Sequence, residues 1–380
     1  MNRMVVLMQV LSVWLVIVGS GWAAEVNSQE AEVVAEVVKR GGSVTVDDTS
    51  PGRSVIGVDL RRFKVTDAGL ERLKGLVQLQ VLRLSTNDVT DAGIDHLRGL
   101  TQLQSLELSF THVTDAGLER IKGLTKLQSL DLSNTHVTDA GLIHLKELTQ
   151  LQVLDLGSTK VTDAGLERIK GLTRLQSLGL SNTHVTDAGL EHLRGLSRLQ
   201  TLNLYDSKVG GAGLEYLKGL TDLQSLYVGG PEMTDAGLVH IEELTQLQSL
   251  NLLVAKVTDA GLLHLKGLTR LQVLDLDSTK VTGTGLIHLK GLTQLQSLDL
   301  PSTQVTDAGL EYLKGLTTLQ SLDLSHTQVT DAGLEHLKGL THLTWLCLEH
   351  TKVSDDGVTK LRQALPKCNV CLRRVYSQPP

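Results

Sequence analysis

A Thr-Asp pair recurs at one fixed spacing along most of this chain, first at Thr66-Asp67 and next at Thr90-Asp91. The register continues without insertion through thirteen positions, the last of which is Ser354-Asp355. A fixed period of about two dozen residues is typical of a solenoid, in which each unit buries its apolar side against its neighbours. The composition agrees, because 41% of the residues are hydrophobic but only 3% are aromatic. One aliphatic side chain, leucine, must therefore build most of the core.

Each unit begins with a predicted strand. In the segment 127–132, Leu130 and Leu132 alternate with Ser129 and Asp131. Alternation with period two indicates a strand with one buried face. We therefore expect Ser129 and Asp131 to point outward.

A short helix is predicted after each strand. Thr138 is a suitable N-cap, and Asp139 would then lie at the positive end of the helix. Leu142, Leu145 and Leu148 recur at helical spacing and place the helix behind the strand.

Most units carry a glycine after the last helical turn, as at Gly123 and Gly171. Glycine adopts positive φ at little cost, so it commonly ends a helix. We expect these glycines to have positive φ.

The frame L-x-x-L-x-L-x-x-T-x-V-T-D-A-G-L, found for instance from Leu151 to Leu166, resembles the leucine-rich repeats. The resemblance covers Val55 to about Leu372. It is similar to the 24-residue subclass related to the cysteine-containing repeats of F-box proteins, as in secreted bacterial repeat proteins. The resemblance implies a right-handed α/β solenoid (horseshoe) of about 13 repeats, with a parallel sheet on the concave face and short helices on the convex face.

In such repeats an Asn or Cys after the strand bonds the backbone of the adjacent turn. Asn87 keeps the Asn, and the resemblance implies that a ladder of threonines replaces it elsewhere. The threonines are Thr111, Thr135, Thr159, Thr183, Thr279, Thr303, Thr327 and Thr351.

The two ends of the chain differ from the repeats. Residues 1–23 resemble a bacterial secretory signal, because Arg3 is followed by an apolar run and then by small residues. Cleavage after Ala23 is expected, and an uncleaved anchor is the alternative. We assign residues 24–54 to an N-terminal cap, 55–353 to the leucine-rich repeat solenoid, and 354–380 to the last helix and a C-terminal cap.

The N-terminal cap is expected to contain a helix followed by a strand. Asn27 and Glu30 have the spacing of a capping box, and Gly41-Gly42 would end the helix. The strand-like segment 43–46 follows. Together they would shield the first leucine face.

The three cysteines leave one thiol over if two of them pair. Cys368 and Cys371 have the Cys-x-x-Cys spacing of half a zinc site, but no second Cys pair or His pair accompanies them at the usual spacing, so no metal is expected. Cys347 and Cys371 are one repeat period apart and would share an outward position on adjacent strands. We predict a disulfide between them, with Cys368 buried as a thiol; the alternative is that all three are small apolar fillers.

The second outward position of the strands is rich in aspartate. The first outward position is mostly serine, with Trp345 near the C-terminal end. The carboxylates either only keep the sheet soluble, or they bind a basic protein or a divalent cation. They are Asp131, Asp155, Asp275, Asp299 and Asp323.

The central repeats depart from the consensus at several positions. Gly210-Gly211 replaces Thr-Asp, and Tyr205, Tyr227 and Leu253 stand on or beside the outward face. Sequence drift in a redundant array is one explanation. The other is that these residues are exposed anchors for a partner.

A histidine recurs at one helix position. We expect half-exposed surface residues, since helix axes about 10 Å apart keep the imidazoles from converging on a metal. The series is His96, His144, His192, His240, His264, His288 and His336.

The formal charge of -6 provides no basic field for nucleic acid. The sequence contains no catalytic or nucleotide-binding motif in a supporting context. We therefore expect a non-enzymatic protein-binding module without a cofactor, exported to the periplasm, the cell surface or the medium. The partner is a protein of unknown identity, and no membrane span is expected after signal cleavage. The alternative is an envelope protein that binds a ligand or cation on its acidic inner face.

Overall fold

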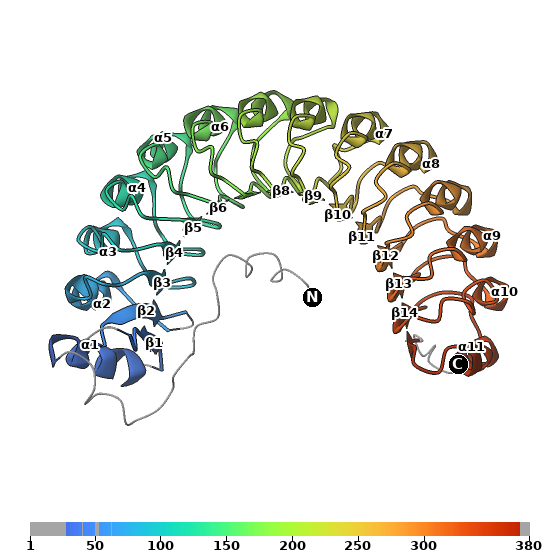
Figure 1. Ribbon diagram of the computed structural model, residues 1–380, viewed down its shortest axis with the longest axis horizontal. Helices are drawn as coiled ribbons and strands as arrows, with labels where there is room; N and C mark the ends of the chain where they lie inside the picture. Colours follow the sequence, from blue (N-terminus) through green and yellow to red (C-terminus); the bar gives the residue numbers. More distant parts are fainter. Residues whose placement is uncertain (1–27, 40, 50–52, 62, 373–380) are drawn as a thin grey trace, which may run out of the picture. The chain divides into compact units, whose positions relative to one another are not determined.

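The computed structural model describes residues 28–39, 41–49, 53–61 and 63–372. The predicted signal segment and Asn27 lie outside the described residues. The chain divides into two compact units, Met1–Val153 and Leu154–Pro380. In each unit, strands form one layer and short helices form the other (Figure 1).

The first unit contains one antiparallel strand pair followed by parallel strands. β1 pairs antiparallel with β2, and β2 to β5 pair in parallel. The strands are β1 (Ser43–Val46), β2 (Val55–Asp59), β3 (Val81–Arg83), β4 (Ser105–Glu107) and β5 (Ser129–Asp131).

The helices of the first unit are one to three turns long, and some turns are 3-10 helices (labelled η). The carboxylate of Glu30, in the first of these helices, accepts a buried hydrogen bond of 2.7 Å from the Val55 amide. The helices are α1 (Ser28–Lys39), α2 (Asp67–Leu70), η2 (Glu71–Gly75), α3 (Asp91–Asp95), α4 (Asp115–Ile121), α5 (Asp139–Leu142) and η3 (Ile143–Leu145).

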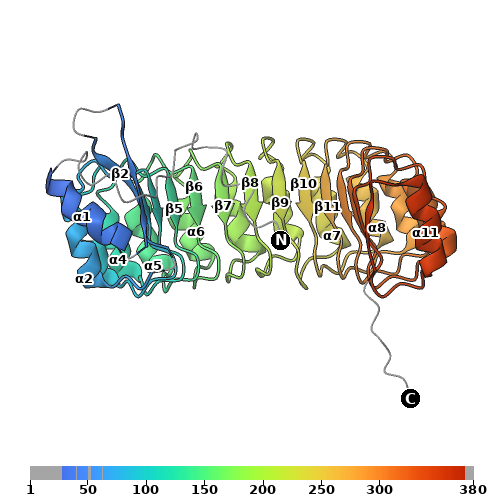
Figure 2. The same ribbon diagram turned by 90° about the horizontal axis from the view of Figure 1, so that it is seen from below.

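The second unit repeats the same parallel pairing. Leu250 pairs with Leu274 at the equivalent position of the next repeat, and every pair from β7 to β15 keeps this register. Figure 2 shows β7 to β11 side by side. The strands are β6 (Val153–Asp155), which begins at the last residue of the first unit, β7 (Ser177–Gly179), β8 (Thr201–Asn203), β9 (Ser225–Tyr227), β10 (Ser249–Asn251), β11 (Val273–Asp275), β12 (Ser297–Asp299), β13 (Ser321–Asp323), β14 (Trp345–Cys347) and β15 (Asn369–Cys371).

The helices of the second unit are again short. Among the described residues, none of the helices in either unit combines the length and apolar character that crossing a membrane requires. The helices are α6 (Asp163–Ile169), η4 (Asp187–Leu193), η5 (Ala212–Leu217), α7 (Asp235–Leu238), η6 (Val239–Ile241), α8 (Asp259–Leu262), η7 (Leu263–Leu265), η8 (Gly283–Leu289), α9 (Asp307–Leu310), η9 (Glu311–Leu313), α10 (Asp331–Leu334) and α11 (Asp355–Ala364).

The strand pattern was predicted correctly. Leu130 and Leu132 are fully buried, whereas Ser129 and Asp131 are only half-buried. Thr138 caps its helix as expected, because its side chain accepts a hydrogen bond from the Ala140 amide. The helix itself ends earlier than the leucine spacing suggested, since η3 stops at Leu145.

The expectation for Gly123 and Gly171 was wrong. Neither has positive φ, and no atom lies within 4 Å of a Cβ built on either. The left-handed residues instead follow the strands, as at Asn134 with φ of 56° and Ser278 with φ of 57°. The sharp reversal of the chain is therefore in the turn from strand to helix.

The repeated Thr-Asp pair joins successive repeats. Asp91 Oδ1 accepts a hydrogen bond of 2.8 Å from the Thr114 amide, and Asp91 Oδ2 accepts one of 2.6 Å from the Thr114 hydroxyl. A Cβ built on Gly117 would lie 2.6 Å from Asp91 Oδ1, so the glycine makes room for the carboxylate. We call this arrangement the Asp-Thr clamp. It accounts for the T-D-A-G sequence through contacts between neighbouring units.

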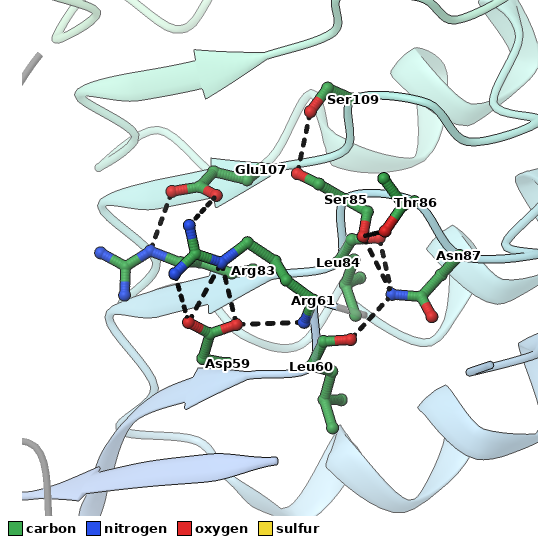
Figure 3. A network of polar contacts seen from close by, with 10 residues as sticks. All are labelled: Asp59, Leu60, Arg61, Arg83, Leu84, Ser85, Thr86, Asn87, Glu107 and Ser109. Atoms are coloured by element: carbon green, nitrogen blue, oxygen red, sulfur yellow. Dashed lines mark hydrogen bonds and ion pairs between the residues drawn. The ribbon is translucent and has the colours of Figure 1, made fainter. Parts of the chain in front are cut away.

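The threonine ladder works differently from what the resemblance implied. Asn87 Nδ2 does reach the adjacent repeat, donating to the Leu60 carbonyl at 3.0 Å and to its own Leu84 carbonyl at 2.9 Å (Figure 3). Thr111 Oγ1 donates only within its own repeat, to the Leu108 carbonyl at 2.6 Å. The hydroxyl is too short to replace the amide, so each threonine closes its own turn.

Candidate functional site

The outward side chains of the strands form a surface on the side of the sheet away from the helices, which we call the strand face. In the second unit, the third residue of each strand from β7 to β15 pairs with its equivalent on the next strand. These residues form one row, which we call the outer row. It runs through Gly179, Asn203, Tyr227, Asn251, Asp275, Asp299, Asp323, Cys347 and Cys371.

Most polar residues of the outer row also stabilise the turn that follows their strand. Asp275 Oδ1 accepts a hydrogen bond of 3.0 Å from the Asp277 amide. Asp323 Oδ1 accepts one of 2.8 Å from the Ser325 amide. Asp155, at the equivalent position of β6, accepts one of 2.8 Å from the Gly157 amide. One oxygen of each carboxylate therefore has a structural role.

Asp299 is the exception, because the residue two positions later is Pro301, which has no amide hydrogen. Asp299 pairs with Asp275 on one side and Asp323 on the other. Burial, followed by the charges of Asp275, Asp323 and Asp277, raises the pKa of Asp299 to about 7. Asp299 therefore lacks the amide hydrogen bond that Asp275 and Asp323 accept, and it lies between two other carboxylates.

Asp275 shares a partner along the row. Its Oδ2 accepts a hydrogen bond of 2.5 Å from Asn251 Nδ2. Burial is the largest effect and raises the pKa of Asp275, although its hydrogen bonds act in the opposite direction. The predicted carboxylates Asp275, Asp299 and Asp323 thus form one half-buried acidic patch.

The aromatic and apolar residues predicted as anchors lie next to this patch. Tyr227 occupies the outer row between Asn203 and Asn251. Tyr205 and Leu253 are each two residues beyond the row, in the turns after β8 and β10. The turns of this region adjoin, because the Gly230 amide donates to the Leu253 carbonyl at 2.9 Å.

These anchors are less exposed than the sequence suggested. Tyr205, Tyr227 and Leu253 are all half-buried. Val254 is more exposed, at 42%, and has φ of 63°. Sequence reasoning missed Val254, although its signal was present as a β-branched residue at the repeat position that needs positive φ.

Trp345 lies apart from these anchors at the C-terminal end of the sheet. It is half-buried and pairs with Ser321 and Asn369 on the neighbouring strands. The structure therefore separates the predicted partner residues of this unit into a central apolar group, an acidic patch, Trp345, and Asp155 on β6.

The first unit has a mixed-charge strand face. Arg83 Nε donates to Glu107 Oε1 at 2.8 Å, and Arg61 Nη2 donates to Asp59 Oδ2 at 2.6 Å (Figure 3). Arg61 also lies 3.8 Å from Glu107. Asp131 pairs with Glu107 in the sheet and accepts hydrogen bonds from both the amide and the hydroxyl of Ser133.

The two arginines compensate the carboxylates unequally. Burial dominates at Glu107 and raises its pKa despite Arg83. At Asp59 burial acts in the same direction, but the hydrogen bonds and charge of Arg61 outweigh it, so the pKa of Asp59 is lowered. Sequence reasoning did not identify this network, although Asp59, Arg83 and Glu107 occupy the same position in successive repeats.

The predicted register of Cys347 and Cys371 is confirmed, since they are directly paired on β14 and β15. Both are free thiols, and Cys371 Sγ donates a hydrogen bond of 3.0 Å to Glu349 Oε1. The Glu349 hydrogen bond, followed by burial, raises the pKa of Cys371 to about 12. The disulfide itself stays a prediction. Cys368 is buried, as expected.

The histidines at the repeated helix position are half-buried, as predicted. None of the seven belongs to a group of metal-ligating side chains within the described part of the chain.

Two family models match the chain. One described as a leucine-rich repeat region matches residues 59–256, and one described as a leucine rich repeat matches residues 293–353. No curated protein matches.

Two solved structures of similar fold come from bacteria. An internalin from Listeria monocytogenes is 26% identical with a TM-score of 0.63, and the match covers 84% of this chain and 94% of the internalin. A leucine-rich repeat protein from Leptospira interrogans is 22% identical with a TM-score of 0.57, and that match covers 80% of this chain and 87% of the other. The second likeness concerns the fold alone. With a family model matching more than half of its length, the chain belongs to the leucine-rich repeat family and folds as an α/β solenoid of parallel strands and short helices.

Proposed function

We propose that the protein is a non-enzymatic protein-interaction module that binds its partner on the strand face of the second unit, the face expected to be concave. Leucine-rich repeat proteins act as protein-interaction modules, and the similarity to an internalin is consistent with that role. The observation that carries the proposal is the placement of Tyr227 in the outer row, with Leu253 beside it and Asp275 two strands away.

This arrangement fits a partner with both apolar and basic groups. Interface energy is usually concentrated in a few aromatic or apolar anchors, and surrounding charges mainly steer the encounter. The acidic patch of Asp275, Asp299 and Asp323 would attract lysine or arginine side chains. We infer that the partner places an apolar segment against Tyr227 and Leu253 and a basic one against the patch.

We further propose that the module is exported from a bacterial cytoplasm. The support is the signal-like composition of residues 1–23, together with the bacterial origin of the similar internalin. Periplasm, cell surface and medium are all compatible with export. Membership of the 24-residue subclass related to F-box repeats belongs to the same proposal and rests on the T-D-A-G-L frame.

Affinity measurement on a captured protein partner tests the binding face. Replacing Tyr227 and Leu253 by Ser is expected to weaken binding by about 2 kcal/mol or more. The control is Leu263→Ser, which alters an exposed apolar side chain on a helix of the same unit. Equal loss in the control, or no loss in the strand-face variant with unchanged stability, would contradict the proposed face.

The acidic patch favours a second candidate function, binding of a cation or small ligand in the cell envelope. Its support is that Asp299 lacks the amide contact of the other carboxylates and lies between two of them. Calorimetric titration with Ca²⁺ distinguishes the two. Heat that disappears in Asp299→Asn, without any effect of Tyr227→Ser, would favour the second function.

A further inference from the structure

Two thiols and a carboxylate converge at the C-terminal end of the second unit. Cys347 on β14 and Cys371 on β15 are paired residues, and Glu349 follows Cys347 by two positions. One ligand atom from each of the three lies within 4.8 Å of the others. The contact between Cys371 Sγ and Glu349 Oε1 is 3.0 Å.

The spacing suits a single small ion. Zn²⁺ binds thiolates at about 2.3 Å and carboxylate oxygens at about 2.0–2.2 Å, so two ligand atoms in its tetrahedral arrangement lie about 3.6–3.8 Å apart. Three atoms within 4.8 Å of one another reach such an ion with small side-chain movements. Thiolate ligands select zinc and similar metals over Ca²⁺ and Mg²⁺, which prefer oxygen.

We propose that Cys347, Glu349 and Cys371 form a binding site for a thiophilic divalent cation such as Zn²⁺ in the reduced protein. Binding releases the two thiol protons to solvent and leaves the sulfurs as thiolates on the ion. Three protein ligands leave a fourth position for water.

The surroundings of the cluster support this assignment. Cys347 is 5% exposed, so one side of the site excludes water, while Cys371 and Glu349 are half-buried and give an ion a path of entry. Asp323 pairs with Cys347 and adds negative charge beside the site. These carboxylates would attract a divalent cation.

Cys368 provides the contrast within the same segment. It is a buried free thiol three residues before Cys371, but it does not belong to the cluster. Its sulfur contacts only the Asn369 carbonyl, at 3.9 Å, among the hydrogen-bond partners within the described residues. A site that used the local Cys-x-x-Cys spacing would require Cys368, whereas the proposed site across β14 and β15 does not. Substitution of Cys368 therefore distinguishes the two.

Anaerobic titration of the reduced full chain with Co²⁺, followed by displacement with Zn²⁺, tests the site. We expect one ion per chain and thiolate-to-cobalt charge-transfer absorption in the near ultraviolet. Cys371→Ser should lower the affinity at least about 100-fold, since even loss of an outer partner of a ligand costs 10–100-fold. Cys368→Ser should leave the affinity and the spectrum unchanged.

A second readout is independent of the spectrum. Zn²⁺ should raise the unfolding temperature of the reduced protein and of Cys368→Ser, because an ion that binds only the folded state stabilises it. Glu349→Gln keeps both thiols and serves if Cys371→Ser folds poorly; it should weaken binding at least about 10-fold. Absence of stoichiometric binding, or binding that depends on Cys368 instead of Glu349 and Cys371, would overturn the proposal.

Discussion

Gly283 occupies the position from which an aspartate would clamp Thr306 of the next repeat. Thr306 accordingly has no capping hydrogen bond on its side chain. In the preceding junction, Asp259 accepts hydrogen bonds of 2.7 Å from the Thr282 amide and 2.6 Å from the Thr282 hydroxyl. The Asp-Thr clamp is therefore absent between Gly283 and Thr306, because glycine replaces the aspartate.

Gly283→Asp should restore the clamp and stabilise the protein by about 1 kcal/mol, the usual worth of one or two added hydrogen bonds. A Cβ at this position would lie 3.0 Å from the Gly309 Cα, so a shift of a few tenths of an ångström is needed. Denaturant unfolding measures the gain, and hydrogen exchange of the Thr306 amide locates it.

Gly211 is the matched position where the same change should fail. Gly211 has φ of 114°, and a Cβ there would lie 2.7 Å from the Gly237 Cα. Gly211→Asp should therefore destabilise the protein. Similar effects of both substitutions would show that clamp geometry does not control stability at these junctions.

Asp91→Ala tests an intact clamp. It removes both hydrogen bonds to Thr114 and leaves its amide without the carboxylate acceptor, which should cost about 1–3 kcal/mol. Asp88→Ala is the control, since Asp88 is an exposed aspartate of the same repeat whose nearest ionic contact, to His112, is 4.0 Å. Denaturation midpoints compare the two variants, and equal losses would contradict a specific role of the clamp.

The repeated features of the fold were predictable because each appears many times within short windows. Leu130 and Leu132 show their burial by alternation, and Thr138 shows its capping role by preceding Asp139 and a helix. The role of Asp91 was not predictable in this way, because its partner Thr114 lies in the next repeat and is reached only through the stacking of repeats. Local propensity described this repeat position, as at Asp139, only as a charge at the helix end and did not reveal the contacts of Asp91 with Thr114.

The candidate sites were predictable where they follow the repeat and not where they depart from it. Register alone placed Cys347 beside Cys371 and Asp299 between Asp275 and Asp323. Glu349 was missed because the equivalent turn position holds different residues in other repeats. The missing amide of Pro301 was also overlooked. Its effect on Asp299 becomes apparent only when the structure shows that the other carboxylates accept a hydrogen bond from the amide two residues later.

Asp299 should make the protein less stable as the pH rises. Its pKa is about 7 in the folded protein against an ordinary value of 3.8, so the folded state holds the proton between these values and the unfolded state does not. Stability from this group is present below about pH 4 and is lost as the pH approaches 7. Asp299→Asn should therefore raise the free energy of unfolding by on the order of 2–4 kcal/mol at pH 8, with little effect near pH 3.5.

Pro301→Ser tests whether the missing amide at position 301 contributes to the raised pKa of Asp299, beside burial and the neighbouring carboxylates. In the next repeat, the Ser325 amide donates a hydrogen bond to Asp323. A serine at position 301 would offer the equivalent amide to Asp299, so the pKa of Asp299 should fall. Carboxyl titration by NMR measures it directly. A pKa that stays near 7 in Pro301→Ser would assign the effect to burial and the neighbouring carboxylates alone.

Cys347 and Cys371 should form a disulfide when the protein is oxidised. Paired residues on adjacent strands about 4.8 Å apart fall within the Cα separation that a disulfide accepts. Each thiol gives up one proton and one electron, so a two-electron oxidant such as glutathione disulfide is required. The bond closes a loop of about 24 residues and should add about 3 kcal/mol in the chain-entropy model.

Non-reducing peptide mapping after oxidation should find this link with Cys368 free, and prior loading with Zn²⁺ should slow its formation because the ion holds the same sulfurs. Three free thiols after exhaustive oxidation, or a link between Cys368 and Cys371, would contradict the pairing.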